Sequence, residues 1–99
     1  MRPLDRLVGM KLLDAEVSTY GAGFQFTNCA LTVFNPVSVN AQLAEVIGSE
    51  VCAISFQENQ CFELNFVNGS KISISLSPQS YSGPEAFCAT FSDNTIVVE

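Results

Sequence analysis

The chain has 99 residues, of which 47% are hydrophobic and only 14% are charged, and its net charge is −6. This length suits one domain with a single modest core, and the low charged fraction argues against disorder. Ten acids and four scattered bases leave no basic stripe that could neutralise phosphates, which argues against nucleic acid as the primary partner.

The residue types also limit the chemistry and the location. The chain has no histidine, so Ser–His, Cys–His and His–metal arrangements cannot form. The four cysteines form no C-x-x-C pair, which argues against structural zinc and predicts free, largely buried thiols. No apolar run approaches the ~20 residues that span a bilayer, and acids interrupt the N-terminal stretch where a signal peptide would be apolar. We therefore expect a cytoplasmic protein that is not an enzyme and needs no cofactor or metal.

The first region, residues 1–36, is predicted to hold a short helical turn and a three-stranded antiparallel meander. Pro3 and Gly9 are typical of the start and end of a helical segment. Residues 11–18 alternate between apolar and polar types, which predicts a half-buried strand, and residues 20–23 are predicted as a turn. We expect the outward side chains of the first strand to be Leu12, Asp14 and Glu16. We expect the inward side chains of the meander to be Leu13, Ala15, Val17, Phe24, Phe26, Leu31 and Val33.

The rest of the chain is predicted as a connector, a second meander and a terminal hairpin. Residues 37–47 form the connector, whose second half favours a short helix, and residues 48–76 form the second meander. Residues 77–85 are rich in proline, glycine and serine and predict an irregular loop, followed by a hairpin with strands at 86–91 and 95–98. We expect the inward side chains of the second meander to be Cys52, Ile54, Phe56, Phe62, Leu64, Phe66, Ile72, Ile74 and Leu76.

The two meanders align with each other. A shift of 39 residues places Gly9 on Gly48, and a shift of 40 places Phe26 on Phe66. Two explanations stay open: a duplicated unit, or two meanders of similar length that align by chance. The predicted fold class is mainly β (β-rich α+β), a sandwich or partly open barrel over residues 1–99 as one domain.

The face that each apolar residue occupies predicts the loop lengths of both meanders. Phe66 and Ile72 are both even-numbered and inward, so the Asn68-Gly69 hairpin needs an odd-length loop, since paired residues share a face. We predict the three-residue loop 67–69, with Gly69 in the left-handed conformation of a bulge. In the first meander the inward residues change from even to odd, which predicts an even-length loop, either residues 28–29 or residues 27–30.

A few exposed side chains are candidates for an interface. Asp14 and Glu16 lie two residues apart on the outer face of a predicted strand, close enough to act together on a partner or a cation. Glu63 has the same outward placement on the second meander. For these three carboxylates a merely solvated strand face is the alternative. Tyr81 and Glu85 lie in the irregular loop, where an aromatic ring and an acid can contact a partner.

One resemblance points to a class of protein. The segments 46–48, 62–70 and 72–74 resemble a pattern in small β-rich bacterial proteins of unknown function, some of which are immunity proteins of polymorphic-toxin or contact-dependent inhibition systems. The segment 81–86 and the hairpin after it are similar to segments of other small bacterial proteins of unknown function. The resemblance implies a cytoplasmic bacterial protein that occludes a toxin, commonly through an acidic surface.

We therefore expect a non-catalytic protein that binds another protein, with a basic toxin as the candidate partner. One alternative is a β-barrel or sandwich that binds a small ligand in a cavity lined by phenylalanines. Another is a self-associating domain, such as a homodimer formed through the apolar edge strand at residues 95–98. Neither nucleic acid nor a membrane is an expected partner.

Overall fold

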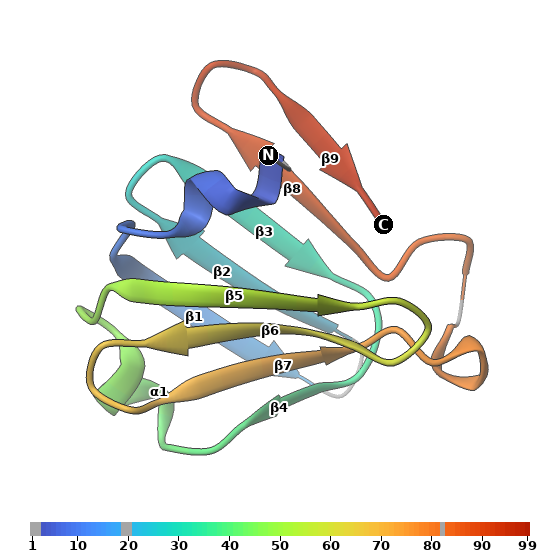
Figure 1. Ribbon diagram of the computed structural model, residues 1–99, viewed down its shortest axis with the longest axis horizontal. Coiled ribbons are helices and arrows are strands. Elements are labelled where there is room, and N and C mark those ends of the chain that lie inside the picture. Colours follow the sequence, from blue (N-terminus) through green and yellow to red (C-terminus); the bar gives the residue numbers. More distant parts are fainter. Residues whose placement is uncertain (1–2, 19–20, 82) are drawn as a thin grey trace.

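The computed structural model describes residues 3–18, 21–81 and 83–99, which form two antiparallel sheets packed face to face (Figure 1). The five-stranded sheet has the order β1 (Leu12–Ser18), β2 (Gly21–Phe26), β3 (Cys29–Val33), β8 (Phe87–Phe91) and β9 (Ile96–Val98). The four-stranded sheet has the order β4 (Val37–Val39), β7 (Lys71–Ser75), β6 (Cys61–Phe66) and β5 (Val51–Gln57). The predicted mainly-β fold is confirmed as a sandwich, and the sheets do not close into a barrel.

Three short helices complete the part of the chain that the structure describes. They are the 3-10 helices η1 (Pro3–Leu7) and η2 (Pro78–Ser80) and the α-helix α1 (Leu43–Val46). Leu4 and Leu7 of η1 and Val46 of α1 are buried, because each of these helices covers apolar core at one side of the sandwich. Within the described ranges, no helix has the length and apolar content needed to cross a membrane.

The core lies between the sheets and is rich in phenylalanine. The Phe62 and Phe87 rings, one from each sheet, stack with centroids 5.1 Å apart, which joins the two layers. The predicted inward residues of β2, β3, β6 and β7 are confirmed as buried. Phe91 is buried too, whereas Phe34 keeps 42% of its surface exposed.

The two halves of the chain are related by an approximate two-fold axis that is visible in the hydrogen bonds. Gly9 N–H donates to Val51 C=O and, reciprocally, Gly48 N–H donates to Leu12 C=O, both at 2.7 Å. Both glycines have positive φ, 93° and 95°. The predicted alignment of the halves is therefore found in three dimensions, where the start of β1 lies against the start of β5.

The symmetry extends to an exchange of strands. After β3 the chain crosses over so that β4 pairs with β7, and after β7 it crosses back so that β8 pairs with β3. Equivalent backbone hydrogen bonds hold the two crossings. Phe34 N–H donates to Ala86 C=O in one, and Ser75 N–H donates to Pro36 C=O in the other. Residues 37–39 were expected in a connector. They form an edge strand because this exchange supplies them with β7 as a partner.

At the start of β1 and of β5, the predicted inward and outward faces are wrong. Each strand contains a register shift, between Leu12 and Asp14 in β1 and between Val51 and Ala53 in β5. The extra residue of a bulge reverses the side-chain alternation before it. Leu12 and Val51 are therefore buried, whereas Leu13 and Cys52, which were expected to face inward, are exposed.

The turn predicted at residues 20–23 is also corrected, because β2 already begins at Gly21. A Cβ atom at Gly21 would lie 2.7 Å from the carbonyl oxygen of Val33 on the neighbouring strand. Glycine is needed there to let two strands pair closely, and not to form a turn. Residues 19–20 lie outside the described ranges.

The predicted hairpin loops are confirmed in length. Phe66 N–H donates to Ser70 C=O and Gly69 N–H donates to Phe66 C=O, which closes the three-residue loop 67–69 with Gly69 at φ 89°. Lys71 lies opposite Asn65 on the outer face and not opposite Phe66. In the first meander the loop is even-length as predicted, but it consists of residues 27–28, because Phe26 pairs directly with Cys29.

Candidate functional site

The outer face of the five-stranded sheet carries two rows of side chains that cross all five strands. Residues paired across antiparallel strands share a face, so the register gives each row directly. The first row is Asp14, Gln25, Ala30, Thr90 and Ile96. The second row is Glu16, Gly23, Thr32, Cys88 and Val98. We call these residues the outer face below.

The outer face is acidic at one edge and apolar at the other. Asp14 and Glu16 stand on β1, whereas Ile96 and Val98 stand on β9 with 62% and 48% of their surface exposed. Four strand spacings of ~4.8 Å separate the two edges, roughly 19 Å in all. Apart from Gln25, the side chains on the strands between them are small, so a partner can approach the sheet closely.

A shallow hollow of about 240 Å³ opens on the outer face beside the acids. Its lining includes Asp14, Glu16, Gly23, Ala30 and Thr32. The hollow exists because Gly23 and Ala30 carry little or no side chain, and a Cβ atom at Gly23 would meet nothing within 4 Å. It is smaller than the ~300–1,000 Å³ of typical small-molecule sites, and it far exceeds the ~30 Å³ share of one water. Its size therefore suits one side chain of a partner.

Among the residues that the structure describes, no base neutralises the carboxylates beside the hollow. The residues that line it include no lysine or arginine, and neither Asp14 nor Glu16 forms an ion pair within the described part of the chain. One Asp14 carboxylate oxygen accepts the backbone N–H of Ala15 at 2.9 Å. Negative charge is thus concentrated at this edge and is open to a cationic partner.

Elsewhere in the described ranges, two bases form ion pairs, Arg6 with Asp93 and Lys71 with Glu63. Arg6 Nη2 lies 3.1 Å from the Asp93 carboxylate, and its guanidinium carbon lies 4.3 Å from the centre of the Phe91 ring. Hydrogen bonds from the side chain and backbone N–H of Thr95, and then the Arg6 guanidinium, lower the pKa of Asp93. This contact joins η1 to the β8–β9 hairpin and is structural.

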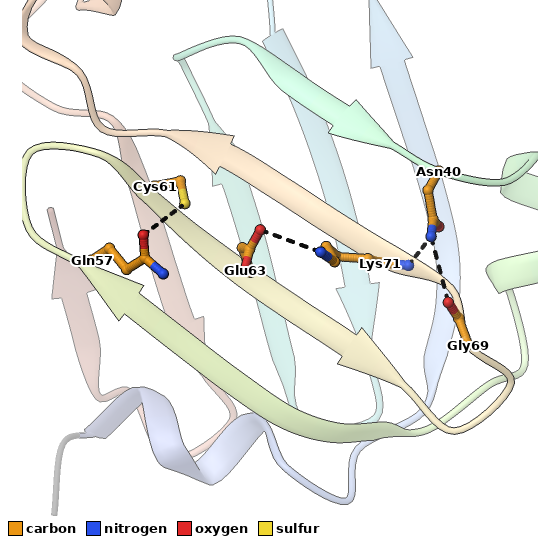
Figure 2. A network of polar contacts seen from close by, with 6 residues as sticks. All are labelled: Asn40, Gln57, Cys61, Glu63, Gly69 and Lys71. Carbon is orange, nitrogen blue, oxygen red and sulfur yellow. Dashed lines mark hydrogen bonds and ion pairs between the residues drawn. The ribbon is translucent and has the colours of Figure 1, made fainter.

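The solvent-exposed side of the four-stranded sheet carries polar side chains that contact one another (Figure 2). Lys71 Nζ lies 3.6 Å from the Glu63 carboxylate. The Asn40 side-chain oxygen accepts the backbone N–H of Lys71 at 2.7 Å, which ties the edge strand region to β7. Because its acid and base neutralise each other, this face is less suited to attract a charged partner.

The structure brings together only some of the sequence candidates. Asp14 and Glu16 lie side by side on one face, as expected, whereas Glu63 lies on the opposite sheet and is paired with a lysine. Tyr81 packs against the core from the loop, and Glu85, four residues later, is half-buried. Neither residue lines the hollow.

Sequence reasoning named the apolar edge strand at residues 95–98 as a self-association candidate, but it missed which of its side chains face outward. Ile96 and Val98 face outward because a three-residue loop pairs Phe91 with Thr95, as the 2.8 Å bond from Phe91 N–H to Thr95 C=O shows. The same parity rule that located the 67–69 loop could have found them, starting from Phe91 as an inward residue.

The thiols are free, as predicted, but they are not uniformly buried. Cys29 is buried, and burial raises the pKa of its thiol to about 11. Cys52 is exposed because it occupies the β5 bulge, and Cys61 and Cys88 are half-buried. In the described ranges, no group of three or more histidine, cysteine or acidic side chains is placed to hold a metal ion.

Comparison of the chain with protein-family models, with curated proteins and with solved structures gave no match. The resemblance to small bacterial β-rich proteins therefore stays a prediction, and function has to be argued from the geometry of the outer face.

Proposed function

We propose that this chain is a non-catalytic protein-binding domain and that it binds a partner with a basic surface through its outer face. The observation that carries the proposal is the division of that face into an uncompensated acidic edge at Asp14 and Glu16 and an exposed apolar edge at Ile96 and Val98.

Each edge supplies a different part of binding. Uncompensated charge steers an oppositely charged partner and fixes its orientation, mainly through the association rate. Exposed aliphatic side chains supply apolar area that is lost from water on contact, at about 25 cal/mol per Å². Between the edges, the small side chains on β2, β3 and β8 allow continuous contact along both rows.

Within this class we favour a toxin-neutralising immunity protein. The support is the acidic net charge of −6, the uncompensated acids of the outer face, and the resemblance of the second meander to bacterial proteins of this kind. A basic toxin is the partner whose charge complements this face.

Small-ligand binding has less support, since the hollow of about 240 Å³ lies on the outside of a sheet and is smaller than typical small-molecule sites of ~300–1,000 Å³. Self-association through the edge strand β9 is the other alternative. Light scattering on the isolated chain distinguishes it, because it predicts a dimer without any partner.

The test is co-expression of the full chain with the products of the genes that adjoin its own, followed by size-exclusion chromatography with light scattering. We expect a heteromeric complex with a basic product. Hydrogen exchange on that complex should show protection in β1, β2, β3 and β9. A complex protected only on β4–β7 would refute the proposed face.

Charge reversal adds a quantitative check. Asp14→Lys with Glu16→Lys should weaken the complex by about tenfold or more, since two attractions become repulsions. Glu45→Lys with Glu58→Lys is the matched control, because both acids are exposed outside the outer face and the net charge changes equally. Equal weakening by the two variants would show that only overall charge matters.

A further inference from the structure

We infer that the hollow of the outer face receives the side chain of a lysine of the partner, with its ammonium group between Asp14 and Glu16. This inference rests on the proposed function, and it specifies which group of the partner is recognised.

The internal symmetry of the chain carries the argument. The register pairs of β1–β2 and β5–β6 superimpose one for one, so that Gly23 is equivalent to Glu63. Likewise Ala30 of β3 is equivalent to Lys71 of β7, because each lies opposite the matching residue in the middle strand of its meander, β2 or β6. The place that is hollow on one sheet is therefore occupied on the other by a lysine side chain and its carboxylate.

The occupied site shows how a lysine lies on this backbone. Lys71 lies across the solvent-exposed side of β7 and β6 (Figure 2). Its Nζ is 3.6 Å from the Glu63 carboxylate, and 44% of its side chain is exposed. The hollow has the same pair of strand positions but carries neither of these two side chains, and its described lining residues include no cation.

The acids of the two sheets are arranged in a complementary way. Asp14 and Glu16 on β1 correspond to Ala53 and Ser55 on β5. The sheet that has its own lysine thus has neutral residues on its flanking strand, and the sheet with the hollow has two carboxylates there. Thr32, which also lines the hollow, adds a hydroxyl acceptor.

Size and charge are both compatible with a lysine side chain. A volume of about 240 Å³ suits one side chain rather than a cofactor. An ammonium group with three donors on a flexible apolar stem can place its stem over Gly23 and Ala30 and its charge against the acids.

The test uses a minimal probe, so that it does not depend on any partner protein. Acetyl-lysine-N-methylamide is titrated into the ¹⁵N-labelled full chain while amide shifts are followed by NMR. We expect the amide shifts of Gly23, Gln25 and Thr32 to saturate, with a dissociation constant in the millimolar range. Acetyl-norleucine-N-methylamide, which has the stem without the ammonium group, should shift none of them.

Three variants define the site. Asp14→Asn with Glu16→Gln keeps the shape and should weaken lysine binding by roughly three- to tenfold. Gly23→Glu with Ala30→Lys installs the ion pair of the other sheet and should abolish binding, while amide dispersion reports that the variant is folded. Glu63→Ala with Lys71→Ala opens a comparable hollow without flanking acids, and it should create no second lysine site.

The outcomes separate the two proposals. Absence of saturable shifts at the hollow, or equal shifts with the norleucine probe, overturns the lysine inference and leaves binding of a basic protein to be judged by light scattering. Unchanged lysine binding in the Asp14→Asn, Glu16→Gln variant also overturns it. Lysine binding at the hollow in the absence of any protein complex would refute the proposed function alone.

Discussion

Gly23 and Ala30 in the first half of the chain and Glu63 and Lys71 in the second half occupy equivalent places on equivalent strands. The backbone of the two halves is alike down to the bulges and the glycine turns. The side chains on the outside differ, so that one sheet is closed by its own ion pair and the other has a hollow beside unpaired acids. A repeated scaffold thus allows one copy to support the fold while the other is open to a partner.

The core provides the largest contrast between the halves. Phe62 is equivalent to Ala22, since each pairs with a matching residue of the strand before it. Phe62 is fully buried and stacks on Phe87, so Phe62→Ala should lower the free energy of unfolding by about 3–5 kcal/mol. Denaturant unfolding measures this, with the more exposed Phe34→Ala as a control that should cost far less. If the two variants lost similar amounts of unfolding free energy, Phe62 would contribute no more to the core than the partly exposed Phe34.

Two glycines of the same strand should respond in opposite ways. Gly21→Ala places a Cβ atom 2.7 Å from the Val33 carbonyl oxygen and should cost about 1–3 kcal/mol, because backbone must move. Gly23→Ala meets nothing and should gain about 0.5–1 kcal/mol, since alanine loses less entropy in a strand. Thermal unfolding of both variants decides this, and a destabilised Gly23→Ala would contradict an open hollow.

The equivalent turn glycines should respond equally. Gly9 and Gly48 have φ of 93° and 95°, where an L-residue is strained by about 1–2 kcal/mol. Gly9→Ala and Gly48→Ala should therefore lower the free energy of unfolding by similar amounts, each in that range. Chemical denaturation measures the pair, and clearly unequal losses would show that the two-fold relation does not extend to energetics.

The smallest expected effect concerns how the two helices are anchored. Arg6 of η1 pairs with Asp93 through its side chain. Its equivalent in α1, Glu45, is instead contacted at its backbone carbonyl, which accepts a hydrogen bond from the Asn68 side chain. The pKa of Asp93 is lowered in the folded state, so its contribution to stability is present above the ordinary aspartate value of about 3.9 and is lost as the pH falls through the lower folded value.

Asp93→Asn should therefore be less stable than the natural chain at neutral pH, and the two should converge in acid below that ordinary value. Urea unfolding across a pH series measures the difference. A constant difference at all pH values would assign the effect to hydrogen bonding by the neutral side chain, not to the charge.

Much of this fold follows from the sequence because its signals are local. Alternation identified the strands, and the parity of Phe66 and Ile72 was enough to predict the three-residue loop at 67–69. Pro3 and Gly9 marked η1, and the shift between the meanders anticipated the two-fold relation. The strands, the loop and η1 depend on residues close together in the chain, and the two-fold relation depends on a pattern that the chain repeats.

The errors arose where contacts between distant segments decide the structure. The bulges that expose Leu13 and Cys52 form because β1 and β5 begin against each other, and β4 is a strand only because β7 accepts it. The hollow exists only where Gly23 and Ala30 meet across two strands beside acids of a third. Alternation along one strand determines which face a residue takes, whereas the neighbours on that face depend on strand order, and only the tertiary structure decides that.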